Sequence, residues 1–209
     1  VAQPPLKKTP RLFFCVQAVL ISLARSTDQY DSGVEADLVQ EQTIDLRKFL
    51  NATIKLWVYS TTQEMQGNII CRYDTKYQIS GNSTFFHRYN VSSSQSTYFE
   101  GKFINWNYNT RQPDDALELY RQDTSGTFSV FDSYEKFDYI GDDGGCAVVS
   151  VLRFGDEPED TVVHRELRLN GSALRNPLAD SNCWKMFNDM LTELSVTTKS
   201  NYSSTCEDK

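Results

Sequence analysis

The 209-residue sequence is poor in the residue types that nucleic-acid-binding proteins and zinc proteins need. It has 21 lysines and arginines against 28 aspartates and glutamates, which gives a net charge of −7. Nucleic acids and anionic membrane surfaces require clustered basic side chains, so neither partner is expected. Only two histidines occur, His87 and His164, so we expect no histidine-based metal site. Beyond the N-terminal segment, no apolar run approaches the roughly 20 residues of a membrane-spanning helix.

The sequence motifs of the common enzyme classes are also missing. There is no nucleophile elbow, no zinc-binding pair and no phosphate-binding glycine loop. The cluster Asp142–Gly145 lacks the remaining ligand spacing of a calcium loop and is typical of a turn. We therefore expect a binding protein rather than an enzyme, with no metal and no cofactor.

The N-terminal segment has the pattern of a secretory signal peptide. Basic residues precede a twelve-residue apolar run (LFFCVQAVLISL), and small residues, Ser22 and Ala24, stand at the third and first positions before a cleavage point. Cleavage there takes the net charge from −7 to −10, because three basic residues and no acids are removed. We expect residues 1–26 to be an N-terminal extension with a signal peptide, and residues 27–209 to form one secreted domain.

Cysteines and glycosylation sequons support secretion. The domain keeps four cysteines, Cys71, Cys146, Cys183 and Cys206. An even number in an oxidising compartment predicts two disulfides, and counting alone leaves three pairings open. Five sequons predict a glycoprotein in which the modified positions face water. They begin at Asn51, Asn82, Asn90, Asn170 and Asn201.

Hydrophobic periodicity predicts an all-β domain between two helices. Residues 34–50 have a helical pattern, and eight strand-like segments follow. These segments are residues 54–59, 69–79, 84–91, 102–108, 116–122, 128–131, 146–154 and 161–169. Eight antiparallel strands are about what a barrel needs to enclose one small ligand.

The last helix is expected over residues 181–194, with Asp180 as its cap. Its apolar stripe would cover the segment 146–154, which is apolar on both faces. Residues 132–143 are acidic and aromatic, and we expect a solvated loop there or a surface for a protein partner. The predicted architecture is an eight-stranded antiparallel barrel with an N-terminal helix and a C-terminal helix packed outside.

The cysteine-bearing segments carry the frame of a known family. Cys146-Ala-Val is followed after 17 residues by Glu166-Leu-Arg, and after 14 more by Cys183. In this frame the sequence resembles the tick salivary lipocalins, which include the histamine-binding proteins of ticks. It departs from the family at Ala147, where the family has Asp, and at Arg168, where it has Trp or Tyr.

The resemblance implies a lipocalin barrel, a disulfide pairing and a ligand pocket. The implied disulfides are Cys71–Cys206 and Cys146–Cys183. The implied amine pocket is lined by Tyr59, Tyr120, Phe128 and Glu166. In it Glu166 would be the counter-ion, and aromatic faces would attract the ammonium group. If both face the lumen, Arg168 would neutralise Glu166, and the pocket would then suit an anionic or neutral ligand. Ala147 replaces the Asp that the family's second amine site uses, which puts that site in doubt.

Three functions remain open at this point. Sequestration of a host amine such as histamine or serotonin is the function that the resemblance favours. A lipid mediator or sterol, such as a leukotriene, thromboxane or cholesterol, is an alternative ligand that Arg47 and Arg168 favour. In the third case the barrel is a scaffold whose loops bind a host immune protein. We expect a monomer.

Overall fold

The computed structural model describes residues 44–63, 71–108, 112–122, 129–155, 160–171, 173–175 and 181–207. Outside these ranges lie the expected signal peptide, residues 34–43 of the first expected helix, the predicted cap Asp180 and the predicted pocket residue Phe128. Within them, no helix has the length and apolar character to cross a membrane.

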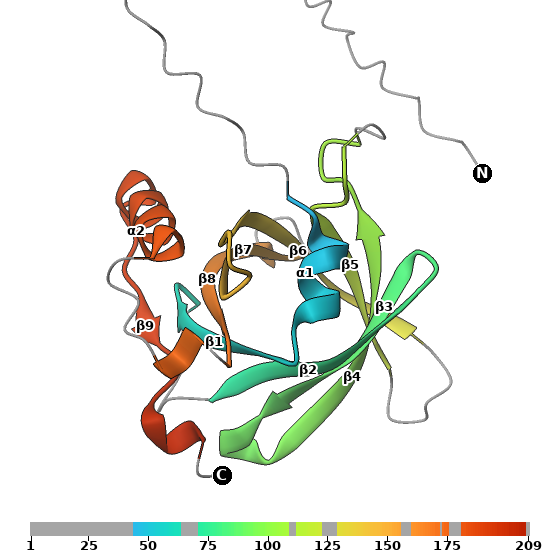
Figure 1. The fold of residues 1–209 in the computed structure, drawn as a ribbon, viewed down its shortest axis with the longest axis horizontal. Helices are drawn as coiled ribbons and strands as arrows, with labels where there is room; N and C mark the ends of the chain where they lie inside the picture. The colour runs from blue at the N-terminus through green and yellow to red at the C-terminus, as the bar shows by residue number, and fades with distance from the viewer. Residues whose placement is uncertain are drawn as a thin grey trace, which may run out of the picture. The chain divides into compact units, whose positions relative to one another are not determined.

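Eight antiparallel strands close into a barrel (Figure 1). They are β1 (Lys55–Thr61), β2 (Arg72–Ser80), β3 (Ser83–Asn90), β4 (Gln95–Ile104), β5 (Ala116–Gln122), β6 (Ser129–Ile140), β7 (Cys146–Arg153) and β8 (Val162–Asn170). Each strand pairs with its neighbour in sequence, and β8 pairs with β1 to close the barrel. A short strand, β9 (Lys199–Ser200), extends the sheet beyond β1. The predicted eight-stranded all-β fold is confirmed.

Two strands are longer than their alternation predicted. Strand β4 begins at Gln95 rather than at residue 102, and β6 runs to Ile140 rather than ending at residue 131. Most of the acidic stretch that was expected to be a loop is therefore strand β6. Its inward residues are Ser133, Glu135 and Phe137, all buried. A serine and a glutamate at inward positions hide the apolar alternation on which the strand prediction depended.

Helix α1 (Leu46–Ala52) closes one end of the barrel (Figure 1). The Asp45 side chain caps it by accepting a hydrogen bond from the Lys48 backbone N–H at 3.0 Å. Arg47 anchors the helix to the rim, because its Nε donates to Asp114 at 2.7 Å and its Nη1 to the carbonyl of Gly81 at 2.9 Å. The helix buries three side chains against the lumen, those of Leu46, Phe49 and Leu50.

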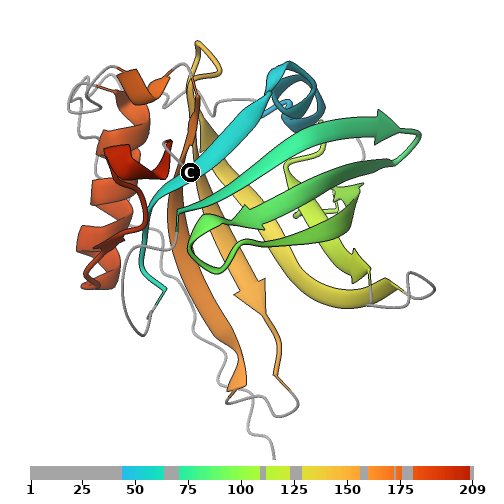
Figure 2. The ribbon, with the colours of Figure 1, turned by 90° about the horizontal axis from the view of Figure 1, so that it is seen from below.

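Helix α2 (Asn182–Leu194) lies outside the barrel and packs on β7 and β8 (Figure 2). Its N-cap is Ser181, which accepts a hydrogen bond from the Trp184 backbone N–H. Beneath the helix, Phe187 packs with outward-facing residues of the barrel, among them Val148 and Leu167. The helix therefore covers the outer face of a strand that is apolar on both sides, as the sequence predicted.

Both disulfides have the pairing that the family resemblance implied. Cys146–Cys183 joins β7 to α2, with 6.2 Å between the two Cα atoms. Cys71–Cys206 joins the residue before β2 to the C-terminal segment, with 5.4 Å between the Cα atoms. The second bridge lies in a small outer cluster with Trp57. The two bridges thus attach both C-terminal segments to the outside of the barrel.

Candidate functional site

The barrel lumen contains an apolar zone and a charged zone. The apolar zone lies next to α1, and its side chains are at most 4% exposed. It comprises Phe86, Phe99, Phe103, Leu117, Leu119 and Phe137. The charged zone lies toward the other end of the barrel, where β2 begins and β3 ends. We call it the ion-pair network, and it comprises Arg72, Asp74, Arg88, Glu135, His164, Glu166 and Arg168.

Strand register places the network inside the barrel. Along β8, His164, Glu166 and Arg168 lie at alternate positions and so share one face, whereas Leu167 and Leu169 lie on the other. Glu166 lies opposite Val149 and Arg168 opposite Ala147, both of which belong to the lumen core. The alternation itself is compatible with either orientation. The orientation is decided by α2, which covers the other, apolar face of β8.

Arg168 and Arg88 are each held by two carboxylates. Arg168 donates from Nε to Glu166 at 2.8 Å and from Nη1 to Glu135 at 2.7 Å. Arg88 donates to both oxygens of Asp74 at 2.7 Å and to Glu135 at 2.8 Å. Glu135 therefore joins the two arginines through its two oxygens. Charge-assisted, multidentate contacts of this kind hold the side chains in one arrangement.

Arg72 is held less completely than the other two arginines. Its Nη2 contacts Oε1 of Glu166, and its side chain is 13% exposed. The same oxygen lies 3.0 Å from Nε2 of His164. In the described part of the chain, Nε of Arg72 and Nδ1 of His164 are buried without a hydrogen-bond partner. Nη2 of Arg168 also lacks a well-aligned hydrogen bond, but it lies 2.7 Å from Oε2 of Glu166. The network atoms that lack both a hydrogen bond and an ion-pair contact in the described residues therefore belong to Arg72 and His164.

The network is balanced, with three arginines against three carboxylates. Each of the six carboxylate oxygens contacts an arginine. Burial alone would raise the pKa of Glu135, but Arg168 and Arg88 lower it to about 2. Burial likewise opposes ionisation of Glu166, yet Arg72 and Arg168 hold its pKa well below its usual range. Both carboxyl groups are therefore ionised at neutral pH.

These pKa shifts predict an acid-sensitive fold. A carboxyl with a lower pKa in the folded state stabilises the fold above its unfolded pKa, near 4.5, and loses that contribution as the pH falls toward 2. We expect the free energy of unfolding to fall between pH 6 and pH 2.5, with Glu135 alone contributing on the order of 3 kcal/mol. Urea denaturation at a series of pH values measures this.

The Glu135→Gln variant is the control for this prediction. It should be less stable at pH 6, and its stability should depend less on pH because one titrating group has been removed. A wild-type protein whose stability changes by less than about 1 kcal/mol over this range would contradict the ion pairing.

The three predicted amine-pocket residues in the described part of the chain are not brought together, and the fourth, Phe128, lies outside it. Glu166 is in the lumen, as the resemblance implied. Tyr59 packs outside the barrel against the apolar residues beneath α2, and its ring stacks on that of Tyr202. Tyr120 lies on the outer face of β5, where its ring contacts Phe131 and Lys102. The residue before each tyrosine faces the lumen, since Val58 lies opposite Arg168 and Leu119 belongs to the core inside the barrel, so each tyrosine points outward.

Sequence reasoning missed most of the ion-pair network. Asp74 and Arg88 lie opposite each other on β2 and β3, and Glu135 lies in the stretch that was expected to be a loop. A signal was present, because Arg72 and Asp74 alternate in the same way as Glu166 and Arg168. Charged residues at alternate positions are normally interpreted as the solvent face of a strand, so this signal pointed outward.

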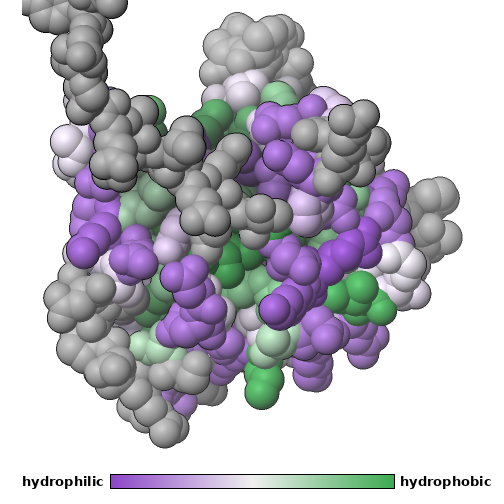
Figure 3. Space-filling view, turned by 45° about the horizontal axis from the view of Figure 1, so that its top comes forward, coloured by the Kyte–Doolittle hydropathy of each residue, from purple (hydrophilic) through white to green (hydrophobic). Residues whose placement is uncertain are grey.

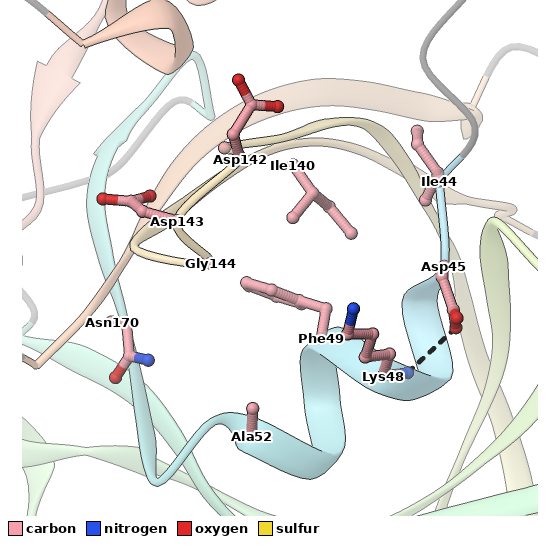
Figure 4. A pocket seen from close by; sticks show the side chains of 11 residues that line it. Ile44, Asp45, Lys48, Phe49, Ala52, Ile140, Asp142, Asp143, Gly144 and Asn170 are labelled. Atoms are coloured by element: carbon pink, nitrogen blue, oxygen red, sulfur yellow. Dashed lines mark hydrogen bonds between the residues drawn. The ribbon is translucent and has the colours of Figure 1, made fainter.

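A hollow lies at the end of the barrel opposite the ion-pair network, between α1 and the turn joining β6 to β7 (Figure 4). Its volume is about 420 Å³, and its floor includes Phe49 and Ile140. Its charged lining residues are Asp45, Asp142, Asp143 and Lys48. Figure 3 shows hydrophobic residues surrounded by mostly hydrophilic ones on this side. We call this hollow the α1 groove, and its carboxylates outnumber its lysine.

The predicted glycosylation sites differ in their accessibility. Asn51 and Asn82 are exposed, and Asn90 and Asn170 are half-buried. Asn201 is 2% exposed, and its backbone pairs with Tyr59 and Cys71. The burial of Asn201 argues against modification there. Glycans at the other four positions remain predictions.

Comparison with known proteins finds similarity in structure but not in sequence. No family model matches the chain, and no curated protein sequence matches it. Insecticyanin from the tobacco hornworm Manduca sexta is similar, with a TM-score of 0.53 and 14% identity over 78% of this chain and 84% of that chain. Lobster apocrustacyanin A1 has a TM-score of 0.47 and 13% identity over 76% and 80%. The likeness to insecticyanin and the closed barrel show that the chain has the lipocalin fold, an eight-stranded antiparallel barrel with one helix at its end and another on its outside.

Proposed function

We propose that this protein is a secreted carrier that binds one small molecule at its barrel and sequesters it. The observation that carries the proposal is the ion-pair network. Buried ion pairs commonly contribute less to stability than apolar side chains of similar volume, so a barrel needs no such network in order to fold. Clusters of buried, strongly perturbed titratable groups are more frequent at functional sites. The lumen network is accordingly the ligand-binding element, and the protein is a carrier rather than an enzyme.

The charge balance favours a neutral amphiphile as the ligand. An added ammonium or carboxylate would leave one unbalanced charge in a poorly solvated lumen, which is costly. An ammonium would also compete with arginines that already contact every carboxylate oxygen of the network. A neutral polar group with an apolar tail avoids both costs. Of the alternatives considered above, this ligand class includes the sterol cholesterol, whereas leukotrienes and thromboxanes carry a carboxylate.

A biogenic amine such as histamine or serotonin is the second candidate. Two observations favour it. Glu166 is buried in the lumen beside Arg72, the arginine with the fewest contacts, which an ammonium could replace. Carboxylates also outnumber the lysine in the α1 groove, where Asp143 is fixed by a hydrogen bond from the Gly145 N–H at 2.8 Å. Sequestration of such an amine would suppress a host inflammatory response.

Secretion is part of the proposal, and the two disulfides support it, since such bridges form and persist in oxidising compartments. We propose a monomer with one ligand per chain.

Titration with matched probes tests the ligand class. Decan-1-ol, decylammonium and decanoate share one apolar tail and differ in the charge of the head group. We expect decan-1-ol to bind at one molecule per chain and at least tenfold more tightly than the two charged probes. Isothermal calorimetry on the secreted, disulfide-bonded protein provides both the stoichiometry and the affinity.

Histamine and serotonin are titrated in parallel against Glu166→Gln and Asp143→Asn, with Glu118→Gln on the outer face of β5 as the control. Submicromolar amine binding that Glu166→Gln abolishes would place an amine in the lumen and overturn the neutral-ligand proposal. Loss with Asp143→Asn alone would place the amine in the α1 groove. Absence of binding by every probe would overturn the carrier function.

A further inference from the structure

The hydrogen-bonding state of His164 follows from its contact with Glu166. Arg72 and Arg168 both contact the Glu166 carboxylate, so this group is ionised and can only accept hydrogen bonds. Nε2 of His164 lies 3.0 Å from Oε1 of Glu166 and must therefore carry the hydrogen. In a neutral imidazole the other nitrogen then has no hydrogen and is an acceptor. The three arginines already balance the three carboxylates, so the neutral form adds no charge to the network, and Nδ1 of His164 is the acceptor in that form.

This acceptor is buried and has no partner within the described residues. The His164 side chain is only 2% exposed, so bulk water does not satisfy it. Nε of Arg72, a hydrogen-bond donor, is also buried without a partner within these residues. Both residues contact the same oxygen of Glu166, so the unpaired acceptor and the unpaired donor belong to adjacent side chains. Buried polar atoms are nearly always paired in folded proteins, which indicates that a partner binds here.

The partner must offer one donor and one acceptor without adding charge. An ammonium group offers donors only, and a carboxylate offers acceptors only. A hydroxyl group offers both and is neutral. We propose that a hydroxyl group of the ligand donates to Nδ1 of His164 and accepts from Nε of Arg72. This inference rests on the proposed carrier function and specifies the polar group that the barrel recognises.

The position of Arg72 makes such a contact accessible. It is the first residue of β2, at the end of the barrel opposite α1, and it is the most exposed of the three arginines. Arg88 and Arg168 each donate hydrogen bonds to two carboxylates and are more deeply buried than Arg72. A ligand that enters at the end of Arg72 therefore meets His164 and Arg72 before the rest of the network.

Imidazole nitrogen resonances give a direct test on the wild-type protein. The chain has only two histidines, and His87 lies on the outer face of β3 between Tyr89 and Tyr98, so it is an internal control. Long-range ¹H–¹⁵N spectra should show Nδ1 of His164 without a hydrogen in the free protein. On addition of decan-1-ol that resonance should move upfield, as expected for a nitrogen that accepts a hydrogen bond, while those of His87 stay unchanged.

A matched ether tests the donor requirement by affinity. Decyl methyl ether keeps the oxygen acceptor of decan-1-ol and lacks its hydrogen. We expect the alcohol to bind at least tenfold more tightly than the ether in the wild type and in His87→Phe, and less than threefold more tightly in His164→Phe. The variant Arg72→Lys, which keeps the charge and lacks Nε, should weaken binding of both probes alike.

The outcomes separate this inference from the proposed function. Equal binding of alcohol and ether by the wild type, or a Nδ1 resonance that does not move, would overturn the hydroxyl contact while leaving a carrier of neutral ligands. Absence of binding by either probe would overturn both. If His164→Phe does not fold, the wild-type spectra and Arg72→Lys still decide the result.

Discussion

Replacing both Cys71 and Cys206 with alanine should lower the free energy of unfolding by about 5 kcal/mol. The bridge joins residues 135 positions apart, so it restricts the unfolded chain over most of the domain. In the folded state it attaches the C-terminal segment to the start of β2, next to the outer cluster around Trp57. Guanidinium denaturation of the secreted protein measures the loss.

The other bridge is the matched control. Cys146 and Cys183 are 37 positions apart, so the paired alanine variant should lose about 4 kcal/mol. We expect the larger loss in the variant without Cys71–Cys206. A reversed order would show that the attachment of α2, rather than the entropy of the unfolded chain, dominates the contribution of these bridges.

Replacing Arg168 with methionine should lower the free energy of unfolding by roughly 3–5 kcal/mol. The side chain is 1% exposed and contacts Glu166 and Glu135. Methionine has a similar volume, so the loss comes mainly from two carboxylates that remain buried without their shared partner. Thermal and chemical denaturation at pH 7 measure it, and part of the loss should be recovered at low pH, where the carboxyl groups are protonated.

Arg153→Met is the control for this variant. Arg153 is on the neighbouring strand, is 37% exposed and lies 3.7 Å from Asp132. A solvent-exposed pair of this kind contributes less than about 1 kcal/mol. Equal losses in the two variants, or a change of less than 1 kcal/mol for Arg168→Met, would show that the network is hydrated and that Arg168 is not essential to it.

The stability of the ion-pair network also affects the binding of a ligand. Its side chains are held by multidentate contacts before a ligand arrives, so a ligand that fits does not have to order them. The same rigidity penalises a ligand that must displace an arginine. Stability and selectivity for a neutral head group therefore arise from the same contacts, and the pH and Arg168→Met experiments test the structural part of that argument without any ligand.

Residues with strong local signals determined much of the fold. Strand β5 coincides with the predicted segment 116–122, and the apolar stripe of α2 covers the strand that is apolar on both faces. The family resemblance added the disulfide pairing. These features were predictable because alternation and helical periodicity depend on positions close together in the sequence.

Apart from Glu166, which the resemblance placed in the pocket, the site was decided by the tertiary structure. Alternation showed that Glu166 and Arg168 share a face, but only the closure of the barrel and the packing of α2 decided that this face is the lumen. Tyr59, which the resemblance placed in the pocket, lies outside because its side of β1 faces away from the lumen. Glu135 reaches Arg168 from β6, more than thirty residues away in sequence, and no local pattern relates them. The sequence by itself thus determined the number and order of the strands, the α2 helix and the residue types, whereas the charge balance of the lumen depends on which strand faces meet inside the closed barrel.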